Sequence, residues 1–147
     1  MSKITCGLFI VSENKLLVVH PTGHKKASLS IPKGIYDNDV DESHLDAAIR
    51  ECFEETNLKI DPCNGEISDL GLEKYKNGKK ILHGYLFQSK IDLIKKNNYI
   101  CNSHFEYKGK NIPEVDKIFW IDLNSNEIRY LHSTQQKLLI KIINNER

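Results

Sequence analysis

The sequence predicts an α/β or α+β domain built on a mixed β-sheet. Segments rich in β-branched and apolar residues, typical of strands, mix along the chain with two segments of helical periodicity. They do not follow strict strand–helix–strand alternation, which argues against a purely parallel sheet. The length of 147 residues suits one domain over residues 1–147, and neither repeats nor a linker interrupt it.

The chain begins with a predicted pair of strands. Residues 4–11 and 15–20 are apolar and β-branched, and "SEN" between them forms the turn. A basic loop, "PTGHKKAS", and a short extended piece, "LSIPKG", follow. Pro32 favours extended geometry at Ile31, because its ring disfavours a helical conformation in the preceding residue.

Residues 43–56 carry the clearest helical pattern. Ser43 suits the N-cap, with Asp46 three residues later in the capping-box position. Asn57 suits the left-handed residue that ends a helix. One mostly apolar stripe recurs at helical spacing: Leu45, Ile49, Cys52, Phe53 and Thr56.

The rest of the chain predicts further strands and a closing helix. "EISDLGLEKY" and "KKILHGYLFQSK" are expected strands joined by "KNG", a hairpin signal. Residues 91–113 are polar and irregular, so we expect either a functional loop or a poorly ordered one. A strand over 116–123, a helical turn or two over 124–131 and a helix over 132–145 follow. Ser133 or Thr134 is the expected cap of that helix, and its inward-facing residues are Leu138, Leu139, Ile142 and Ile143.

Composition argues against several classes of function. The formal net charge is +1, so no global charge favours nucleic acid or a membrane surface. The four cysteines show neither CxxC pairs nor zinc-ligand spacing, so we expect free thiols in a reducing compartment. The chain has no signal-peptide pattern and no apolar run near the ~20 residues of a membrane span. We therefore expect a cytoplasmic protein, and its oligomeric state stays open.

Three glutamates crowd the end of the helix predicted over residues 43–56. Glu51, Glu54 and Glu55 fall within about 100° of helix surface, where like charges repel one another. The C-terminal end of a helix also disfavours anions, by about 0.3–1 kcal/mol each. A hard divalent cation, Mg²⁺ or Mn²⁺, would relieve both costs, because carboxylate oxygens suit it. The alternative is a solvated acidic helix face.

Positive groups precede this helix in the sequence. Lys33 and Gly34 lead into the acidic loop before it, and His24 and Lys26 lie in the basic loop further upstream. Cations and a glycine-exposed backbone opposite a metal-binding cluster suit a polyphosphate. We therefore expect these four residues to bind substrate, and a spare glutamate to orient water or take its proton.

The stretch "GIYDNDVDESHLDAAIRECFEETNL", residues 34–58, resembles the Nudix box. That pattern is G, five residues, E, seven residues, then REUxEExGU, where U is aliphatic. The matching positions are Gly34, Glu42, Arg50, Glu51, Glu54, Glu55 and Leu58. Three positions depart from it: seven residues separate Gly34 from Glu42, Asn57 replaces glycine, and Cys52 replaces an aliphatic residue.

The resemblance implies a Nudix fold, with the mixed sheet sandwiched between helices. It also implies hydrolysis, with Mg²⁺ or Mn²⁺, of a pyrophosphate bond in a nucleoside diphosphate linked to another group. Glu54 and Glu55 would bind the metal, and Glu51 would be a ligand or the general base. Arg50 and Glu42 would join helix and loop by an ion pair. A backbone carbonyl near Lys33 or Gly34, and an acidic residue of a later loop, Glu106 or Glu114, would complete the metal ligands.

The tetrapeptide "IPKG" resembles the branch of the family that acts on dinucleoside polyphosphates and diphosphoinositol phosphates, in which Lys33 would face phosphate. Two other functions stay open. One is a catalytically weak or inactive nucleotide sensor on the same fold, and the other is a metal-free interaction domain that docks through the acidic face. Four histidines have no evident partner and are expected to be ordinary surface or core residues: His44, His83, His104 and His132.

Overall fold

The computed structural model describes residues 3–96 and 98–145. Its main sheet contains β1 (Lys3–Ser12), β2 (Lys15–Pro21), β3 (Lys33–Ile35), β4 (Gly65–Lys74), β5 (Lys80–Ser89) and β8 (Val115–Asp122). The strand order is β4-β5-β1-β2-β8, and β3 pairs with β1 off this path. Strands β1 and β5 run parallel while the other pairs are antiparallel, so the predicted mixed sheet is confirmed.

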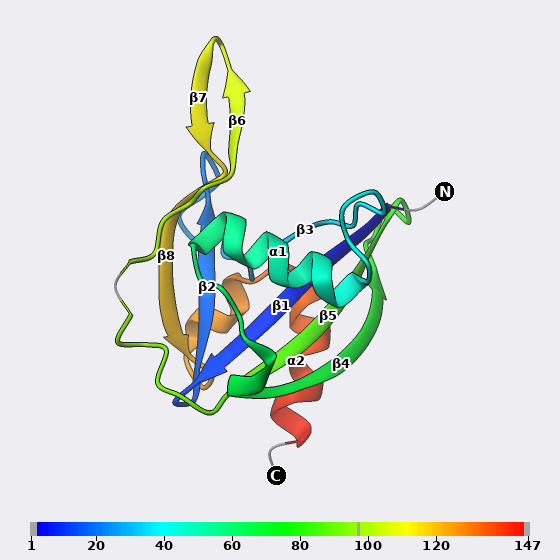
Figure 1. Cartoon of the computed structure of the whole chain (residues 1–147), viewed down its shortest axis with the longest axis vertical. Coiled ribbons are helices and arrows are strands. Elements are labelled where there is room, and N and C mark those ends of the chain that lie inside the picture. Colours follow the sequence, from blue (N-terminus) through cyan, green and yellow to red (C-terminus); the bar gives the residue numbers. More distant parts are fainter. Residues whose placement is uncertain (1–2, 97, 146–147) are drawn as a thin grey trace.

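Helices cover both faces of this sheet (Figure 1). Helix α1 (His44–Thr56) packs on β1 and β3, and α2 (Ser133–Asn145) packs on β4 and β5. Two short 3₁₀ helices, η1 (Pro62–Asn64) and η2 (Asn126–Tyr130), precede β4 and α2. Successive residues of β1 point to opposite faces, so Leu8 joins the core beneath α1 and Phe9 the core beneath α2. Burial of each such side chain contributes about 1.5–3 kcal/mol.

Strands β2 and β3, the two antiparallel partners of β1, diverge from each other and make room for a site. Strand β3 pairs with Thr5–Gly7, near the start of β1, whereas β2 pairs only with Val11 and Ser12 at its end. From there β2 runs along β8 instead. Ser30 in the segment between β2 and β3 forms a bridge with Val19 of β2. The expected extended piece before Gly34 therefore lines the fork between the strands.

A hairpin stands clear of the body in Figure 1, formed by β6 (His104–Tyr107) and β7 (Lys110–Pro113). The expectation of an irregular segment over residues 91–113 is wrong here. The turn residues Lys108 and Gly109 have φ values of 51° and 77°, as a two-residue hairpin turn requires. All four residues of β6 are exposed, so no hydrophobic alternation marks this strand in the sequence.

Both ends of α1 follow the sequence prediction. Ser43 Oγ accepts a hydrogen bond from the Asp46 N–H at 3.1 Å, and Asn57 ends the helix with φ of 67°. The buried stripe is rotated from the expected one. Phe53 is 42% exposed, while the face against the sheet consists of Ala47, Ala48, Cys52, Glu55 and Thr56. A glutamate therefore occupies the buried side of the helix, where periodicity alone favours an apolar residue.

Helix α2 has a different cap from the one expected. The Thr134 N–H donates to His132 Nδ1 at 3.2 Å, so His132 caps the helix and Ser133 is already its first residue. The expected inward face is confirmed: Leu138, Leu139 and Ile142 are buried, and Ile143 packs against the same core.

The four cysteines are free, with Cys6 and Cys52 buried. No helix within the described ranges is both long and apolar enough to cross a membrane.

Candidate active site

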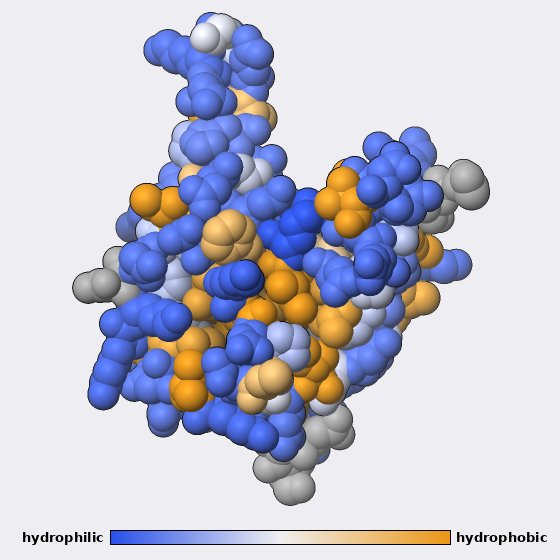
Figure 2. Space-filling model, in the orientation of Figure 1, coloured by the Kyte–Doolittle hydropathy of each residue, from blue (hydrophilic) through white to orange (hydrophobic). Residues whose placement is uncertain are grey.

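Two of the three predicted helix glutamates, Glu51 and Glu55, line a polar cavity of about 590 Å³, called the acid cavity below. It is lined by Thr5, Lys33, Gly34, Ile35, Tyr36, Asp37, Asn38, Arg50, Glu51, Glu55, Lys80 and Glu114. Strand β3, the loop 36–43 and α1 thus supply most of its walls. In the space-filling view a hydrophilic notch lies between the β6–β7 hairpin and this loop (Figure 2).

A second cavity of about 330 Å³, the side cavity, shares Lys33, Glu55 and Glu114 with the acid cavity. Thr22, His24 and Phe105 also line it. Glu114 precedes β8, and its backbone N–H donates to Ser103 O at 2.9 Å at the base of the hairpin. Of the two later acids considered as metal ligands, the structure thus brings Glu114 to the helix glutamates. Glu106 lies on exposed β6 and lines neither cavity.

Arg50 joins α1 to the acidic loop, but its partner is Asp41. Arg50 Nε and Nη2 donate to the two Asp41 carboxylate oxygens at 2.8 and 2.9 Å. The expected ion pair with Glu42 is wrong, since Glu42 is exposed whereas Asp41 is buried. The loop turns at Asp37, whose N–H also donates to Asp41 Oδ2, and this turn directs Asp41 inward. These hydrogen bonds, led by those of Arg50, lower the pKa of Asp41.

Arg50 also holds two of the helix glutamates. Its Nη1 donates to Glu54 Oε2 at 2.8 Å and to Glu51 Oε1 at 3.4 Å. Its Nη2 reaches the Ile35 carbonyl at 3.3 Å, next to Gly34. One guanidinium thus ties together the helix, the acidic loop and β3, and it offsets part of the repulsion among the carboxylates.

Gly34 permits a close approach between β3 and the Glu51 carboxylate. A Cβ atom built on Gly34 would overlap the Glu51 carboxyl group, so any other residue here would displace that side chain. Gly34 itself has ordinary extended pairing with Cys6 of β1. The glycine at this position is therefore explained by the space that the glutamate occupies, and not by backbone conformation.

Burial raises the pKa values of two carboxyl groups at the site. Glu55 is 7% exposed, and burial raises its pKa to about 7 despite the opposing effect of Lys33, whose N–H donates to Glu55 Oε1 at 3.4 Å. Burial and the neighbouring Glu54 raise the pKa of Glu51. Both shifts show that negative charge is costly in this cavity unless a cation accompanies it.

The donors of the acid and side cavities fit a hard divalent cation. They are carboxylate and carbonyl oxygens, which Mg²⁺ and Mn²⁺ prefer over the nitrogen and sulfur ligands of zinc. Thr22 Oγ1, buried in the side cavity, has no hydrogen-bond partner among the described residues. Within the described ranges no three acidic, His or Cys side chains already converge on one point. Glu54 would therefore have to turn from Arg50 to join Glu51 and Glu55 around an ion.

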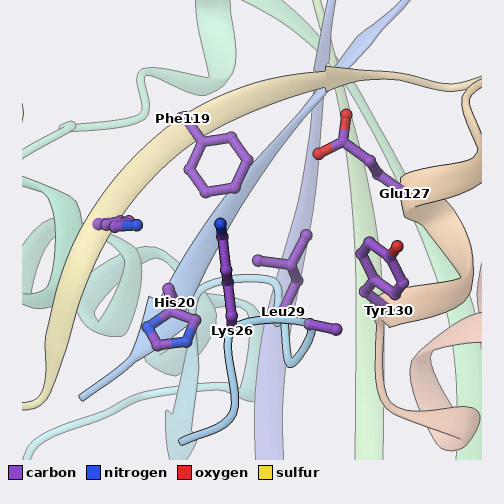
Figure 3. A pocket seen from close by; sticks show the side chains of 8 residues that line it. His20, Lys26, Leu29, Phe119, Glu127 and Tyr130 are labelled. Atoms are coloured by element: carbon purple, nitrogen blue, oxygen red, sulfur yellow. The ribbon is translucent and has the colours of Figure 1, made fainter. Parts of the chain in front are cut away.

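The structure brings together three of the four residues expected to bind substrate. Lys33 and Gly34 line the acid cavity, and His24 lines the side cavity. Lys26 lies elsewhere, in a groove of about 280 Å³ that shares no residue with the acid cavity. Figure 3 shows Lys26 extending into this groove between Phe119 and Tyr130.

His20, at the edge of that groove, fixes the basic loop. Its Nδ1 lies 2.6 Å from Asp116 Oδ1 and its Nε2 lies 2.8 Å from the Lys25 carbonyl oxygen. The Lys25 carbonyl and the Asp116 carboxylate raise the pKa of His20, because both acceptors favour the imidazolium form, which donates from each nitrogen.

Two histidines without an evident partner in the sequence are paired in the fold. His44 Nδ1 lies 2.8 Å from His83 Nδ1, and His83 Nε2 lies 2.7 Å from Asp69 Oδ1. This chain ties the first residue of α1 to β4 and β5, on which the two partners lie. No local sequence pattern could have revealed it, because the three residues come from three separate elements.

Sequence reasoning also missed functional candidates that only the fold brings to the site. Asp41 was hidden beside Glu42, whose seven-residue spacing to Arg50 matched the box. Lys80 was not missed: as a basic residue it was already a weaker candidate to face phosphate, and the fold brings it from the start of β5 to Lys33 in the acid cavity. Thr22 carries no motif at all. The only signal of Asp41 in the sequence is that it is an acid next to Glu42, and therefore an alternative partner for Arg50.

Comparisons with known proteins agree with this geometry. The family model described as NUDIX domain matches residues 1–141. An uncharacterized 17.7 kDa protein of the e-segB intergenic region of Enterobacteria phage T4 is 36% identical over 125 residues, covering 79% of this chain and 80% of that protein.

Solved structures share the fold at lower identity. A bifunctional NMN adenylyltransferase/ADP ribose pyrophosphatase from Francisella tularensis superposes with a TM-score of 0.66 at 20% identity, over 99% of this chain and 41% of that one. This chain thus spans less than half of the Francisella protein. The NUDIX domain of Shewanella oneidensis NrtR, complexed with ADP ribose, gives a TM-score of 0.66 at 17% identity, over 99% of this chain and 88% of that one. Gly34, Arg50, Glu51 and Glu55 of the box line one acid cavity, and the family model matches nearly the whole length, so the chain belongs to the Nudix family.

Proposed function

We propose that this chain is a metal-dependent hydrolase that cleaves a pyrophosphate bond in a nucleoside diphosphate linked to another group. The observation that carries this proposal is that the buried Glu55 and the partly buried Glu51, whose pKa values are both raised, line one cavity with the ammonium-bearing side chains of Lys33 and Lys80. Such an arrangement is costly for a protein that binds nothing there. It becomes favourable when a cation and an anionic phosphate chain enter together.

Each residue at the site has a role in this proposal. Glu54, Glu55 and Glu114, with the Gly34 carbonyl, would hold Mg²⁺ or Mn²⁺, and Glu51 lies beside them. The bound cation would supply stabilisation of negative charge on the phosphate oxygens. Lys33 and Lys80 would bind phosphate directly, and His24 in the side cavity would donate to it.

Proton transfer is assigned to Glu51. Its carboxylate is fixed between Arg50 and the Gly34 backbone, and its raised pKa suits a group that takes a proton from the attacking water. Arg50 does not contact phosphate in this scheme. It positions Glu51 and Glu54 from its anchor on Asp41.

Similar solved structures whose ligand or activity is named narrow the proposed substrate class. One is an ADP ribose pyrophosphatase joined to an adenylyltransferase, a form of which was solved with AMP and a Mn ion, and another binds ADP ribose. The "IPKG" segment adds dinucleoside polyphosphates to the proposed range. In support, Lys33 lines both the acid cavity and the side cavity.

A substrate panel with product identification tests the proposal. ADP ribose, diadenosine polyphosphates, nucleotide sugars and nucleoside triphosphates would be incubated with Mg²⁺, and products identified by mass spectrometry. We expect turnover of at least one member, reduced at least about 100-fold by Glu55→Gln. Glu66→Gln, the same change at an exposed position of β4, is the matched control and should leave the rate unchanged.

Two results would count against hydrolysis. One is no turnover of any member by the wild-type chain, and the other is equal turnover by wild type and Glu55→Gln. Nucleotide binding by calorimetry without any product would support the alternative of a nucleotide sensor on the same fold.

A further inference from the structure

The groove that Lys26 enters carries chemistry that the acid cavity does not use. It lies between β8, the basic loop after β2 and η2, and it is called the β8 groove below. Its volume is about 280 Å³, close to the lower limit of about 300 Å³ for pockets that bind small molecules. It shares no residue with the acid cavity or the side cavity. A ligand in the β8 groove would therefore occupy a site separate from the carboxylates of α1.

Two aromatic rings form walls of the β8 groove. Phe119 comes from β8 and Tyr130 from η2, and both are partly buried and pack against the core beneath α2. Leu29, which is 5% exposed, lines the groove with them. In Figure 3 the two rings stand on either side of the Lys26 side chain. Because core packing already holds these rings, they can contact a flat ligand at a small cost in side-chain entropy.

Two lysines give the β8 groove its positive charge. Lys117 and Phe119 are two residues apart on β8, so their side chains point to the same face of the sheet. The strand register places Lys117 beside His20 of β2. Among the ion pairs of the described residues, none involves Lys26 or Lys117. Both ammonium groups are therefore available to an anion, and lysine is a common partner of phosphate.

The other charged groups of the β8 groove define its two ends. His20 does not contribute a free donor, because its ring nitrogens already face Asp116 and the Lys25 carbonyl. Glu127 is exposed and lies on η2 with Tyr130, across the groove from His20 (Figure 3). The end at β8 thus suits a phosphate, and the end at η2 offers an acceptor to an N–H group of a heterocycle.

A purely structural role of Lys26 is the alternative. Its methylene stem would cover the Phe119 and Tyr130 rings while its ammonium group stays in water. Lys26 is exposed, however, so its side chain can swing aside and admit a ring. One lysine would also suffice for that role, whereas Lys117 adds a second cation without an ion-pair partner among the described residues.

From these residues we propose that the β8 groove binds a phosphorylated aromatic ring. The ring lies between Phe119 and Tyr130, and the phosphate binds Lys26 and Lys117. A nucleoside monophosphate and an aryl phosphate without a base share this chemistry of a flat ring and a dianion. The inference goes beyond the proposed function, because no residue of the groove lines the acid cavity and binding here requires no hydrolysis.

A backbone amide NMR titration of the isotope-labelled chain tests the proposal residue by residue. AMP, phenyl phosphate and inorganic phosphate would be added separately in EDTA, so that no divalent cation draws phosphate to the acid cavity. We expect saturating shifts at Leu29, Lys117 and Phe119 with at least one ring compound, at an affinity at least about 5-fold above that of inorganic phosphate. Saturation by AMP alone identifies a nucleotide as the ligand, and saturation by phenyl phosphate as well shows that a plain ring suffices.

Two variants separate the ring from the phosphate. Phe119→Leu keeps apolar bulk against the core and should weaken binding of the ring compound about 5-fold, with no change for inorganic phosphate. Lys117→Gln removes one ammonium group and should weaken binding of all three compounds about 3-fold. Lys110→Gln, the same change at an exposed position of β7, is the matched control and should change none of them.

Three results would overturn this inference. The first is the absence of saturating shifts at the groove amides, including shifts confined to residues of the acid cavity. The second is equal affinity for inorganic phosphate and both ring compounds, and the third is binding by Phe119→Leu and Lys117→Gln that matches Lys110→Gln. A wild-type chain that hydrolyses nothing but binds a ring compound in the β8 groove would remove the proposed function and leave this inference standing.

Discussion

The pairing of Arg50 with Asp41 leads to a prediction that distinguishes two neighbouring acids. Asp41→Asn keeps the size of the side chain but places an NH₂ group against a guanidinium that has only donors. Two charge-assisted hydrogen bonds, of 2.8 and 2.9 Å, are lost or weakened. Breaking a buried ion pair costs about 3–5 kcal/mol. Arg50 is 28% exposed and keeps Glu54, so we expect a loss of about 2–3 kcal/mol.

The matched control is Glu42→Gln, an equivalent change one residue away. Glu42 is exposed, so its effect should stay within about 0.5 kcal/mol. Thermal unfolding with EDTA is a suitable assay, since about 2–4 °C corresponds to 1 kcal/mol for a chain of this size. We expect Asp41→Asn to lower Tm by about 5–10 °C and Glu42→Gln by less than about 2 °C.

The reverse order of these two Tm values would refute the reasoning. A large effect of Glu42→Gln with none of Asp41→Asn would restore the ion pair that the Nudix-box spacing suggests. Equal large effects would mean that both acids hold Arg50, which the exposed position of Glu42 contradicts.

Three further predictions follow from the site and the core. Gly34→Ala should displace the Glu51 carboxylate and lower kcat at least about 10-fold while circular dichroism stays unchanged; an active Gly34→Ala would remove the steric argument. In EDTA, the free energy of unfolding should fall as pH rises from about 4.5 to about 7, because Glu55 keeps its proton to a higher pH in the folded state than in the unfolded state. Urea titrations at several pH values measure this slope, and either Glu55→Gln or saturating Mg²⁺ should flatten it. An unchanged slope in Glu55→Gln would contradict the prediction. Of the four cysteines only Cys63 is exposed, so it should react fastest with Ellman's reagent, and the buried thiols of Cys6 and Cys52 should react only in denaturant.

Local signals in the sequence predicted the fold and the helix glutamates well. The Ser43 cap, the Asn57 terminus and the hairpin joined at "KNG" depend on neighbouring residues, and all three are confirmed. The same holds for the grouping of Glu51 and Glu55, which follows from their positions on α1 and their common cavity. Short-range chemistry is visible in a sequence because it needs no knowledge of the tertiary structure.

Other features depend on how distant segments meet. Burial of Glu55 in place of Phe53 depends on the rotation of α1 against the sheet, which periodicity leaves open when apolar and polar residues share a stripe. The Tyr75 and His132 rings, whose centroids lie 5.1 Å apart, come from segments more than 50 residues apart in the sequence. The choice of Asp41 over Glu42 depends on the turn at Asp37, which an insertion in the loop makes unpredictable from family spacing.

Binding of Mn²⁺, followed by the loss of its free-ion EPR signal, is the most direct test of the claim that these carboxylates exist to hold a cation. The account predicts that the wild-type chain suppresses the signal and that Glu55→Gln weakens this binding at least about 10-fold, while Glu66→Gln does not. Equal suppression by wild type and Glu55→Gln, or none by wild type, would contradict it.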